Sequence, residues 1–164
     1  MMNTKLTQTL LHSRAGMAAL LLRVPVGLIL AAHGAQKLFG WFGGYGLEGT
    51  GQWLASIGLA PGALMALLAG GAEFFGGLAL VLGLLTRPAA LVSAFTMLVA
   101  IFAVHIGNGL FMSNNGYEYA LTLFAATSAL TLQGAGRFSL DTLLLARLAG
   151  GRTAQGAVTG NTPA

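Results

Sequence analysis

The sequence predicts an all-α integral membrane protein: a four-helix transmembrane bundle followed by a short C-terminal amphipathic helix on the cytoplasmic side. Hydrophobic residues make up 55% of the 164 residues and charged residues only 7%, whereas a soluble domain carries about 25% charged residues. The mean hydropathy is +0.77. Four apolar runs also approach about 20 residues, the length that crosses a bilayer core as a helix. Together these observations exclude a water-facing globule, and they make the lipid bilayer the first partner of the chain.

The four apolar runs predict the four spans in chain order. Arg23, His33 and Lys37 interrupt the first run, and Glu73 is the only charge in the second. The third begins at Pro88, because proline suits the first turn of a helix. The fourth run is the shortest. The runs cover residues 15–39, 61–85, 88 to at least 106, and 117–132.

The connections between the runs differ in length and composition. Residues 40–60 are rich in glycine and aromatic residues, which predicts a long loop at the non-cytoplasmic interface. Thr86–Pro88 predicts a tight cytoplasmic turn. After the fourth run, Ser139 can cap a helix and Asp141 can complement its first-turn dipole. Leucines then recur at helical spacing until Gly150–Gly151, which predicts an amphipathic helix on the membrane surface; they are Leu140, Leu143, Leu144 and Leu148.

The distribution of basic residues predicts that both termini are cytoplasmic. With Arg23 set aside as intramembrane, six basic residues flank one side of the spans and Lys37 alone flanks the other, and the side richer in Lys and Arg faces the cytoplasm. The six are Lys5, Arg14, Arg87, Arg137, Arg147 and Arg152. We expect a cytoplasmic segment over 1–14, a membrane domain over 15–148 and a disordered tail over 149–164. A cleaved signal peptide fits poorly, because Arg23 would lie inside its apolar region.

Several short motifs, in order along residues 15–148, make the chain resemble the DoxX/DoxD-like family of four-span membrane proteins. They are Arg23 with Gly27, Ala32–Gly40, Gly71–Glu73 with Gly76–Leu78, Gly83–Arg87, Gly116–Ala120 and Gly136–Asp141. The resemblance implies a multi-pass protein of a bacterial or archaeal cell (inner) membrane. It further implies a membrane subunit of a quinone-linked oxidoreductase system, with a quinone as the cofactor or substrate to consider. It carries no family-wide catalytic motif.

Ionisable groups inside a membrane are costly, so each is a functional candidate. Glu73 and Arg23 have opposite signs, and we expect them to pair, either as a structural ion pair or as a substrate-binding pair. Alternatively, Arg23 extends to the cytoplasmic surface, and Glu73 is then protonated or paired with His33. The candidate catalytic residues are His33, Glu73, His105 and Glu118; the candidate substrate-binding residues are Arg23, Lys37, Trp41 and Tyr117.

The two halves of the chain also resemble each other. Residues 31–39 align with 103–111 and share Ala, His, Leu and Phe, and each His-bearing run precedes one that carries a Glu. A diverged duplication of a two-helix unit explains this pattern, and chance similarity of short apolar segments is the alternative. In a duplication the counterpart of Arg23 is Phe95, so the polar site would be centred on the first two spans.

Other chemistries find little support in the sequence. His33, His105, Glu73 and Glu118 are the residue types of a zinc or iron site, but no His-x-x-x-His or Glu-x-x-His pair lies on one predicted helix, so the metal signal is weak. A haem held by two histidines would need both rings to face one another at one depth, and the chain is short of bulk for it. The chain has no Cys, no nucleotide-binding glycine motif in a strand–helix context, and no clustered basic patch for nucleic acid. Three functions stay open: a membrane subunit of an oxidoreductase system, acting with a partner subunit or as a homo-oligomer; a small oligomeric transporter or channel; and a scaffold without chemistry of its own.

Overall fold

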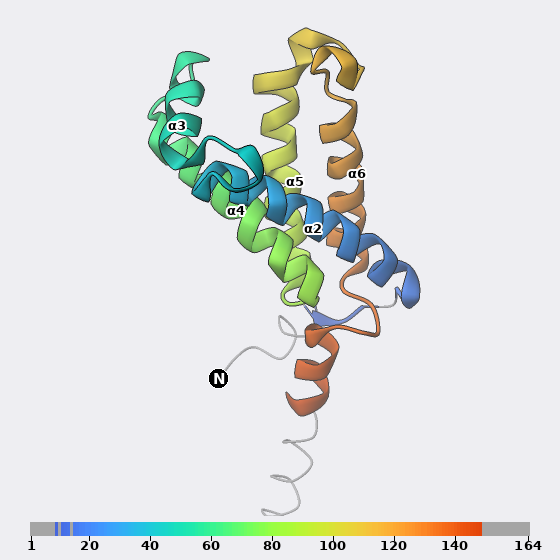
Figure 1. The fold of residues 1–164 in the computed structure, drawn as a ribbon. Coiled ribbons are helices and arrows are strands. Elements are labelled where there is room, and N and C mark those ends of the chain that lie inside the picture. The colour runs from blue at the N-terminus through green and yellow to red at the C-terminus, as the bar shows by residue number, and fades with distance from the viewer. Residues whose placement is uncertain (1–8, 10, 14, 149–164) are drawn as a thin grey trace, which may run out of the picture.

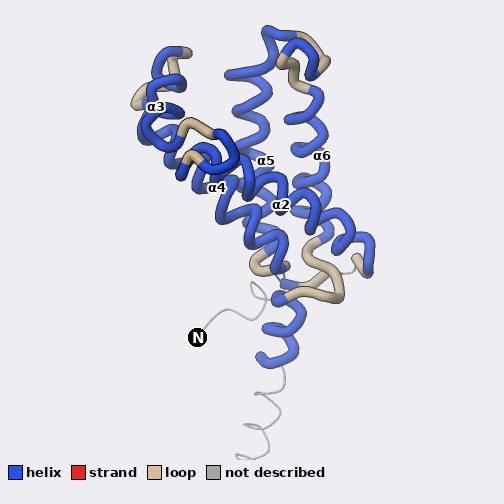
Figure 2. The backbone as a smooth tube through the Cα atoms, viewed as in Figure 1, coloured by secondary structure: helices blue, strands red, loops and turns tan. Residues whose placement is uncertain are grey.

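The computed structural model describes residue 9 and residues 11–13 and 15–148, and these residues form helices and turns without strands. Figure 1 shows the arrangement, and Figure 2 separates helix from loop. The helices are α2 (Met17–Phe39), α3 (Gly46–Ser56), α4 (Gly62–Leu82), α5 (Thr86–Val99) and α6 (Glu118–Gln133), followed by a helix over residues 140–148. The predicted all-α class is confirmed. The predicted tail 149–164 and most of the segment 1–14 lie outside the described residues.

Three helices of the described chain are long and apolar enough to cross a membrane: Met17–Phe39, Gly62–Leu82 and Thr86–Asn108. The third joins α5 to a π-helical segment, Ala100–His105, and a 3₁₀ turn, Ile106–Asn108. In contrast, α6 has 16 residues. A helix of that length is about 24 Å long, and a bilayer core is about 30 Å thick. The chain is therefore a membrane protein, and the fourth span stays a prediction.

Helices α2 and α4 pack closely along a shared glycine face. A Cβ atom added to Gly27 would lie 2.6 Å from the carbonyl oxygen of Gly77, and one added to Gly77 would lie 2.5 Å from the backbone nitrogen of Ala31. Such distances leave no room for a side chain, so these glycines allow the two backbones to touch. The contact sets the register of the two helices and, with it, the position of every polar group on them.

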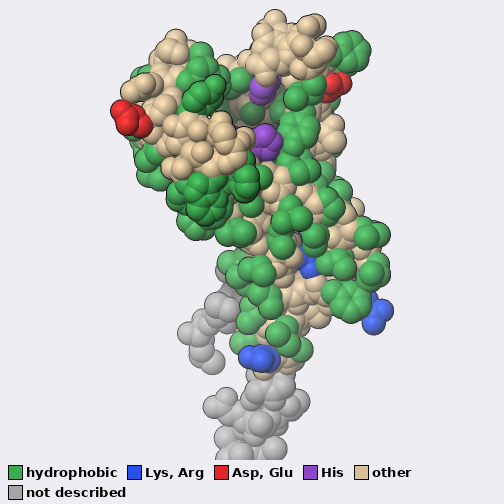
Figure 3. All heavy atoms as spheres, in the orientation of Figure 1, with side chains coloured by type: hydrophobic (Ala, Val, Ile, Leu, Met, Phe, Trp, Pro, Cys, Tyr) green, Lys and Arg blue, Asp and Glu red, His purple; other side chains and the backbone are tan. Residues whose placement is uncertain are grey.

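Helices α5 and α6 form a second pair, which runs beside the first (Figure 1). Its interior includes the buried side chains of Met97, Leu123 and Leu130. Outside, large apolar side chains such as Phe95 and Phe102 are exposed, and Figure 3 shows the hydrophobic surface that results. In a bilayer that surface faces lipid. The hydrocarbon core offers no hydrogen-bond partners, so it favours helices, whose backbone groups bond within the helix.

The predicted loop over residues 40–60 is wrong in part, because residues 46–56 form α3. Glycine is a weak helix former, but packing decides the outcome here. Leu54 and Thr50 are buried, and a Cβ atom added to Gly51 would lie 3.1 Å from the Cα atom of Ala63 at the start of α4. Helix α3 thus rests on the first turn of α4.

The two ends of the bundle have different chemistry. We call the end that carries Arg87 and Arg137 the basic end, and the end that carries Trp41, Tyr45 and Trp53 the aromatic end. The helix over 140–148 begins at the basic end and extends away from the bundle (Figure 1). Its predicted cap is confirmed, because Ser139 Oγ accepts the N–H of Thr142 at 3.2 Å. Its placement on a membrane surface stays a prediction.

Candidate functional site

The predicted site residues separate into two groups at opposite ends of the bundle. Arg23 lies toward the basic end, and the other polar candidates lie toward the aromatic end. The expected ion pair between Arg23 and Glu73 is wrong. The glycine register explains why: Gly27 faces Gly77, and one helical turn earlier along α2, Arg23 reaches the C-terminal end of the antiparallel α4 rather than its middle.

Arg23 is a structural hub of the basic end. Its side chain is only 1% exposed, and its guanidinium donates to four backbone carbonyl groups. The acceptors are Leu80 at 2.8 Å, Val81 at 2.5 Å, Ala135 at 3.1 Å and Phe138. The planar fork of arginine satisfies several acceptors at once, so Arg23 ties the end of α4 to the segment that follows α6. It extends toward the basic end, as the alternative expected, but it is buried rather than hydrated.

Asp141 completes this hub. Its carboxylate is fully buried and accepts the backbone N–H groups of Leu85 at 2.6 Å and Thr86 at 3.0 Å. It therefore caps α5, a neighbouring helix, and does not serve only the dipole of its own helix as expected. Leu85 has a positive φ of 46°, a costly conformation for a residue with a side chain. Two carboxylate hydrogen bonds hold the turn, and Arg23 interacts electrostatically with Asp141.

At the aromatic end, Glu73 is paired with Lys37. The Glu73 side chain is 4% exposed and the Lys37 side chain 27%, and Nζ of Lys37 contacts Oε2 of Glu73. The carboxylate is thus enclosed between α2 and α4, while the amine keeps a path to the outside. Of the charged pairs between side chains in the described residues, this is the one within ion-pair distance.

His33 lies beside this ion pair and contacts α6. Its Nε2 atom is 3.4 Å from the hydroxyl oxygen of Tyr119, and the two ring centroids are 5.7 Å apart. His33 and Tyr119 also both interact electrostatically with Glu73. A histidine, a phenol, an amine and a carboxylate thus form one polar cluster, which we call the Lys37–Glu73 cluster. Each member can donate or accept a proton.

The other two candidate catalytic residues have their hydrogen-bond partners in the connection between α5 and α6. His105 Nδ1 is 2.8 Å from the carbonyl oxygen of Asn115, and the Glu118 carboxylate accepts the N–H of Met112 at 2.6 Å. Both residues therefore shape the connection between α5 and α6. Figure 3 shows histidine side chains in the hollow between the tip of this connection and the lobe that contains α3. No group of three potential metal ligands occurs in the described residues.

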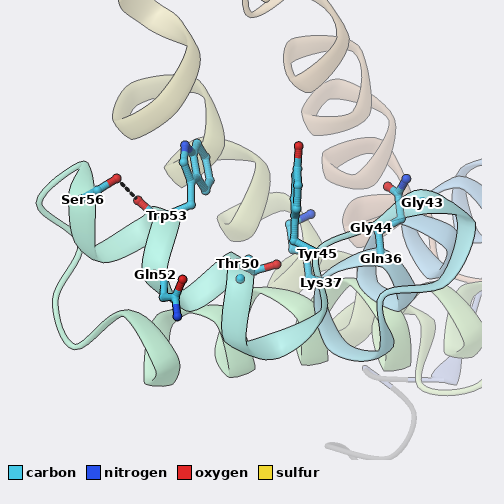
Figure 4. Close-up of a pocket in the computed structure, with 10 residues that line it drawn as sticks. Gln36, Lys37, Gly43, Gly44, Tyr45, Thr50, Gln52, Trp53 and Ser56 are labelled. Carbon is cyan, nitrogen blue, oxygen red and sulfur yellow. Dashed lines mark hydrogen bonds between the residues drawn. The ribbon is translucent and has the colours of Figure 1, made fainter.

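A pocket of about 730 Å³ opens at the aromatic end beside the cluster. It lies between the end of α2 and one face of α3, and Lys37 belongs to both the pocket and the buried ion pair. Figure 4 shows the Tyr45 and Trp53 rings standing on the same side of α3. The lining residues are Gln36, Lys37, Gly43, Gly44, Tyr45, Gly49, Thr50, Gln52, Trp53 and Ser56.

The two aromatic residues expected to bind substrate do not line this pocket. Trp41 is exposed, and its ring packs against Phe39 with centroids 5.0 Å apart. Tyr117 packs against the bundle core. Sequence reasoning missed Tyr45 and Tyr119. No spacing in the sequence marks Tyr45 and Trp53 as a pair, because Tyr45 precedes α3 and the first residue of that helix, Gly46, has a positive φ of 66°.

A comparison with protein-family models identifies the family of the chain. The family model described as DoxX matches residues 18–106. The chain belongs to the DoxX family. The matched region runs from α2 into the π-helical segment, so it contains Lys37, Glu73, His33 and the pocket. Tyr119 and the Asp141 cap lie beyond it.

Three bacterial proteins are similar to this DoxX protein, and one of them is named as an inner membrane protein. It is 38% identical over 112 residues to "Putative oxidoreductase CatD" of Bacillus subtilis, an alignment that covers 68% of this chain and 77% of the relative. It is 36% identical to "Inner membrane protein YqjF" of Escherichia coli, over 73% of this chain and 92% of the relative. An uncharacterised protein of Haemophilus influenzae is 30% identical, with 79% and 85% covered. No solved structure matches the chain.

Proposed function

We propose that this DoxX protein is a quinone-binding membrane subunit of an oxidoreductase system, in which the Lys37–Glu73 cluster exchanges protons with the quinone. One observation carries the proposal: Lys37 lines an open pocket and at the same time pairs with a carboxylate buried between two membrane helices. An acceptor bound in the pocket and the Glu73 carboxylate would therefore compete for the same ammonium group, and a proton on Glu73 would release that group to the ligand. The resemblance to a relative named as an oxidoreductase supports the same class.

The chemistry of a quinone suits this arrangement. Reduction of a quinone to a quinol takes up two electrons and two protons, and oxidation releases both. The ammonium of Lys37 can donate a hydrogen bond to a quinone oxygen, and the Glu73 carboxylate can accept a proton that a quinol releases. His33 and Tyr119 continue the path, since they lie within reach of one another. The electrons would pass to or from a partner oxidoreductase subunit.

We further infer four membrane spans, with the basic end in the cytoplasm. The basic end carries Arg87, Arg137 and Arg147, whereas Lys37 at the aromatic end is neutralised by Glu73. This distribution follows the positive-inside bias. The chain has no Cys, so single cysteines at Tyr45 and Arg137 can be labelled with an impermeant maleimide in intact cells and in inverted vesicles. Labelling of both positions from the same side would refute the topology.

The function itself is tested by binding a short-chain quinone to the protein in lipid nanodiscs. Ubiquinone-1 and menadione should bind saturably, and binding should change the number of protons held by the protein. Proton release or uptake is measured with a pH indicator in weak buffer. Glu73→Gln keeps the shape of the side chain but cannot ionise, so it should abolish most of the proton change. Thr122→Ser, a change on α6 at a residue outside the polar cluster, is the control.

Two outcomes would overturn the proposal. One is the absence of saturable quinone binding by the wild-type protein at pH 6, 7 and 8. The other is a proton change that Glu73→Gln leaves intact, because His33, Tyr119 or Lys37 would then titrate without the carboxylate. Proton flux through wild-type proteoliposomes, abolished by Glu73→Gln, would instead favour the transporter hypothesis.

A further inference from the structure

Two aromatic side chains line the pocket, Tyr45 immediately before α3 and Trp53 within it, and Gly49 lies between them in the sequence. Gly49 and Trp53 are four residues apart and lie one helical turn from each other on α3, whereas Tyr45 precedes the helix and joins it through Gly46, whose φ is 66°. Gly49 contributes no side chain to the gap. Figure 4 shows both rings standing upright with open space between them. We call this gap the aromatic slot.

Polar groups surround the base of the aromatic slot. Lys37 extends from α2 and lines the same pocket as Tyr45 (Figure 4). Thr50 and Gln36 also line the pocket. Gln36 Nε2 donates to the carbonyl of Phe42 at 3.3 Å, which fixes the chain reversal that joins α2 to α3. The slot therefore offers aromatic faces on its walls and a cationic hydrogen-bond donor at its base.

This combination selects a class of ligand. Aromatic walls favour a planar ring, which stacks on Tyr or Trp, and an amine at the base favours an acceptor oxygen on that ring. A pocket volume of about 730 Å³ lies within the range of about 300–1,000 Å³ that small-molecule sites occupy. An ordinary aromatic belt at the membrane interface would not need the glycine gap or the shared lysine.

We propose that the aromatic slot is the binding site of the ring: a planar ring with acceptor oxygens stacks on Tyr45 or Trp53 and takes a hydrogen bond from Lys37. The inference rests on the proposed function and adds the location and the recognition chemistry. It assigns ligand entry to the aromatic end and assigns Tyr45, Gly49 and Trp53 as binding residues. His105, which is bound to the connection between α5 and α6, has no part in this site.

The sharpest test fills the slot. Gly49→Leu places a branched side chain between the two rings, and it should weaken binding of menadione and ubiquinone-1 at least tenfold. Gly71→Leu is the control for the same change on a helix where a Cβ atom meets nothing within 4 Å; at Gly49 a Cβ atom would lie 2.9 Å from Cβ of Tyr45, so Gly49→Leu disrupts the slot both by filling it and by displacing Tyr45. Trp53→Leu and Tyr45→Leu should each weaken binding about three- to tenfold, the factor that one aromatic contact supplies. Trp41→Leu removes an aromatic residue that does not line the pocket and should change binding less than twofold.

Fluorescence gives a second readout, which does not depend on affinity. The protein has two tryptophans, at positions 41 and 53, and quinones quench indole emission on contact. In Trp41→Phe, saturating quinone should quench the remaining Trp53 emission strongly. In Trp53→Phe, quenching of Trp41 should match that of free tryptophan amide at the same quinone concentration.

The outcomes separate this inference from the function on which it rests. If the wild-type protein does not bind quinone saturably by equilibrium dialysis, both fail. If it binds, and Gly49→Leu binds as tightly as Gly71→Leu, the function stands and the aromatic slot is refuted. Binding that quenches Trp41 and spares Trp53 would also refute the aromatic slot and leave the function standing. Circular dichroism of each variant excludes loss of the fold as the cause of weaker binding.

Discussion

Removal of Lys37 should lower the stability of the protein more than removal of Glu73. Lys37→Met leaves a carboxylate that is 4% exposed without its partner, whereas Glu73→Leu leaves an amine that is 27% exposed and can be hydrated. Removal of one member of a buried ion pair costs about 3–5 kcal/mol, and the cost falls when solvent reaches the remaining charge. We therefore expect a loss of about 3 kcal/mol for Lys37→Met and about 1–2 kcal/mol for Glu73→Leu.

The double variant Lys37→Met, Glu73→Leu should recover part of this loss. It leaves no unpaired charge, and two apolar side chains can replace the pair between α2 and α4. Its destabilisation should be about 2 kcal/mol smaller than the sum of the single losses, a coupling typical of residues in contact. In a chain of this size about 1 kcal/mol corresponds to 2–4 °C, so Lys37→Met should melt about 6–12 °C below the wild type.

Thermal unfolding in one detergent, followed by circular dichroism at several pH values, measures these effects. Leu28→Met is the control, because it changes an exposed residue on α2 and leaves the ion pair and its neighbours intact. Additive losses in the two single variants would refute the reasoning, since they would mean that Lys37 and Glu73 do not stabilise each other. A greater loss for Glu73→Leu than for Lys37→Met would show that burial of the carboxylate does not control the energetics.

Three further predictions concern the framework that holds this site. Arg23→Lys should severely reduce the yield of folded protein in size-exclusion chromatography, because lysine cannot donate to four carbonyl groups at once. The control Arg137→Lys should leave the yield unchanged. Equal yields for the two variants would argue against the structural role of Arg23. Asp141→Ala should cost about 1–2 kcal/mol by removing the cap of α5, measured by thermal unfolding, and a change below the error of the melt would contradict the cap. Gly77→Ala should destabilise by about 1–3 kcal/mol through overpacking against α2, while Gly71→Ala should be neutral or stabilising; the reverse order of melting temperatures would rule out the proposed helix contact.

Local patterns in the sequence were sufficient to predict most of the helices. The first and second runs matched α2 and α4 to within a few residues, because an apolar run of span length has no other stable form in lipid. The exception was α3, where glycine and aromatic residues favoured a loop on composition, and contact with the start of α4 stabilised a helix instead.

The polar partners were harder to predict, because they depend on register. The sequence shows that Arg23, Lys37 and Glu73 lie in or at the edge of apolar runs, but not which of them meet. A shift of α4 by one turn along α2 would bring Glu73 close to a different partner. The predicted pair of Arg23 and Glu73 was wrong for this reason. Asp141 was likewise assigned to its own helix, although its true partners lie 55 and 56 positions earlier in the chain.

The sequence by itself determined the solvent of this protein, the position of its first three long apolar segments and the identity of the costly polar residues, since these follow from composition and from the length of a bilayer-crossing helix. Only the tertiary structure decided how those residues are used. Contact between backbones at Gly27 and Gly77 sets the register that places Lys37 against Glu73. The packing of α3 then places Tyr45 and Trp53 in one pocket with Lys37. Contacts of this kind depend on how the helices pack, which local sequence patterns do not specify.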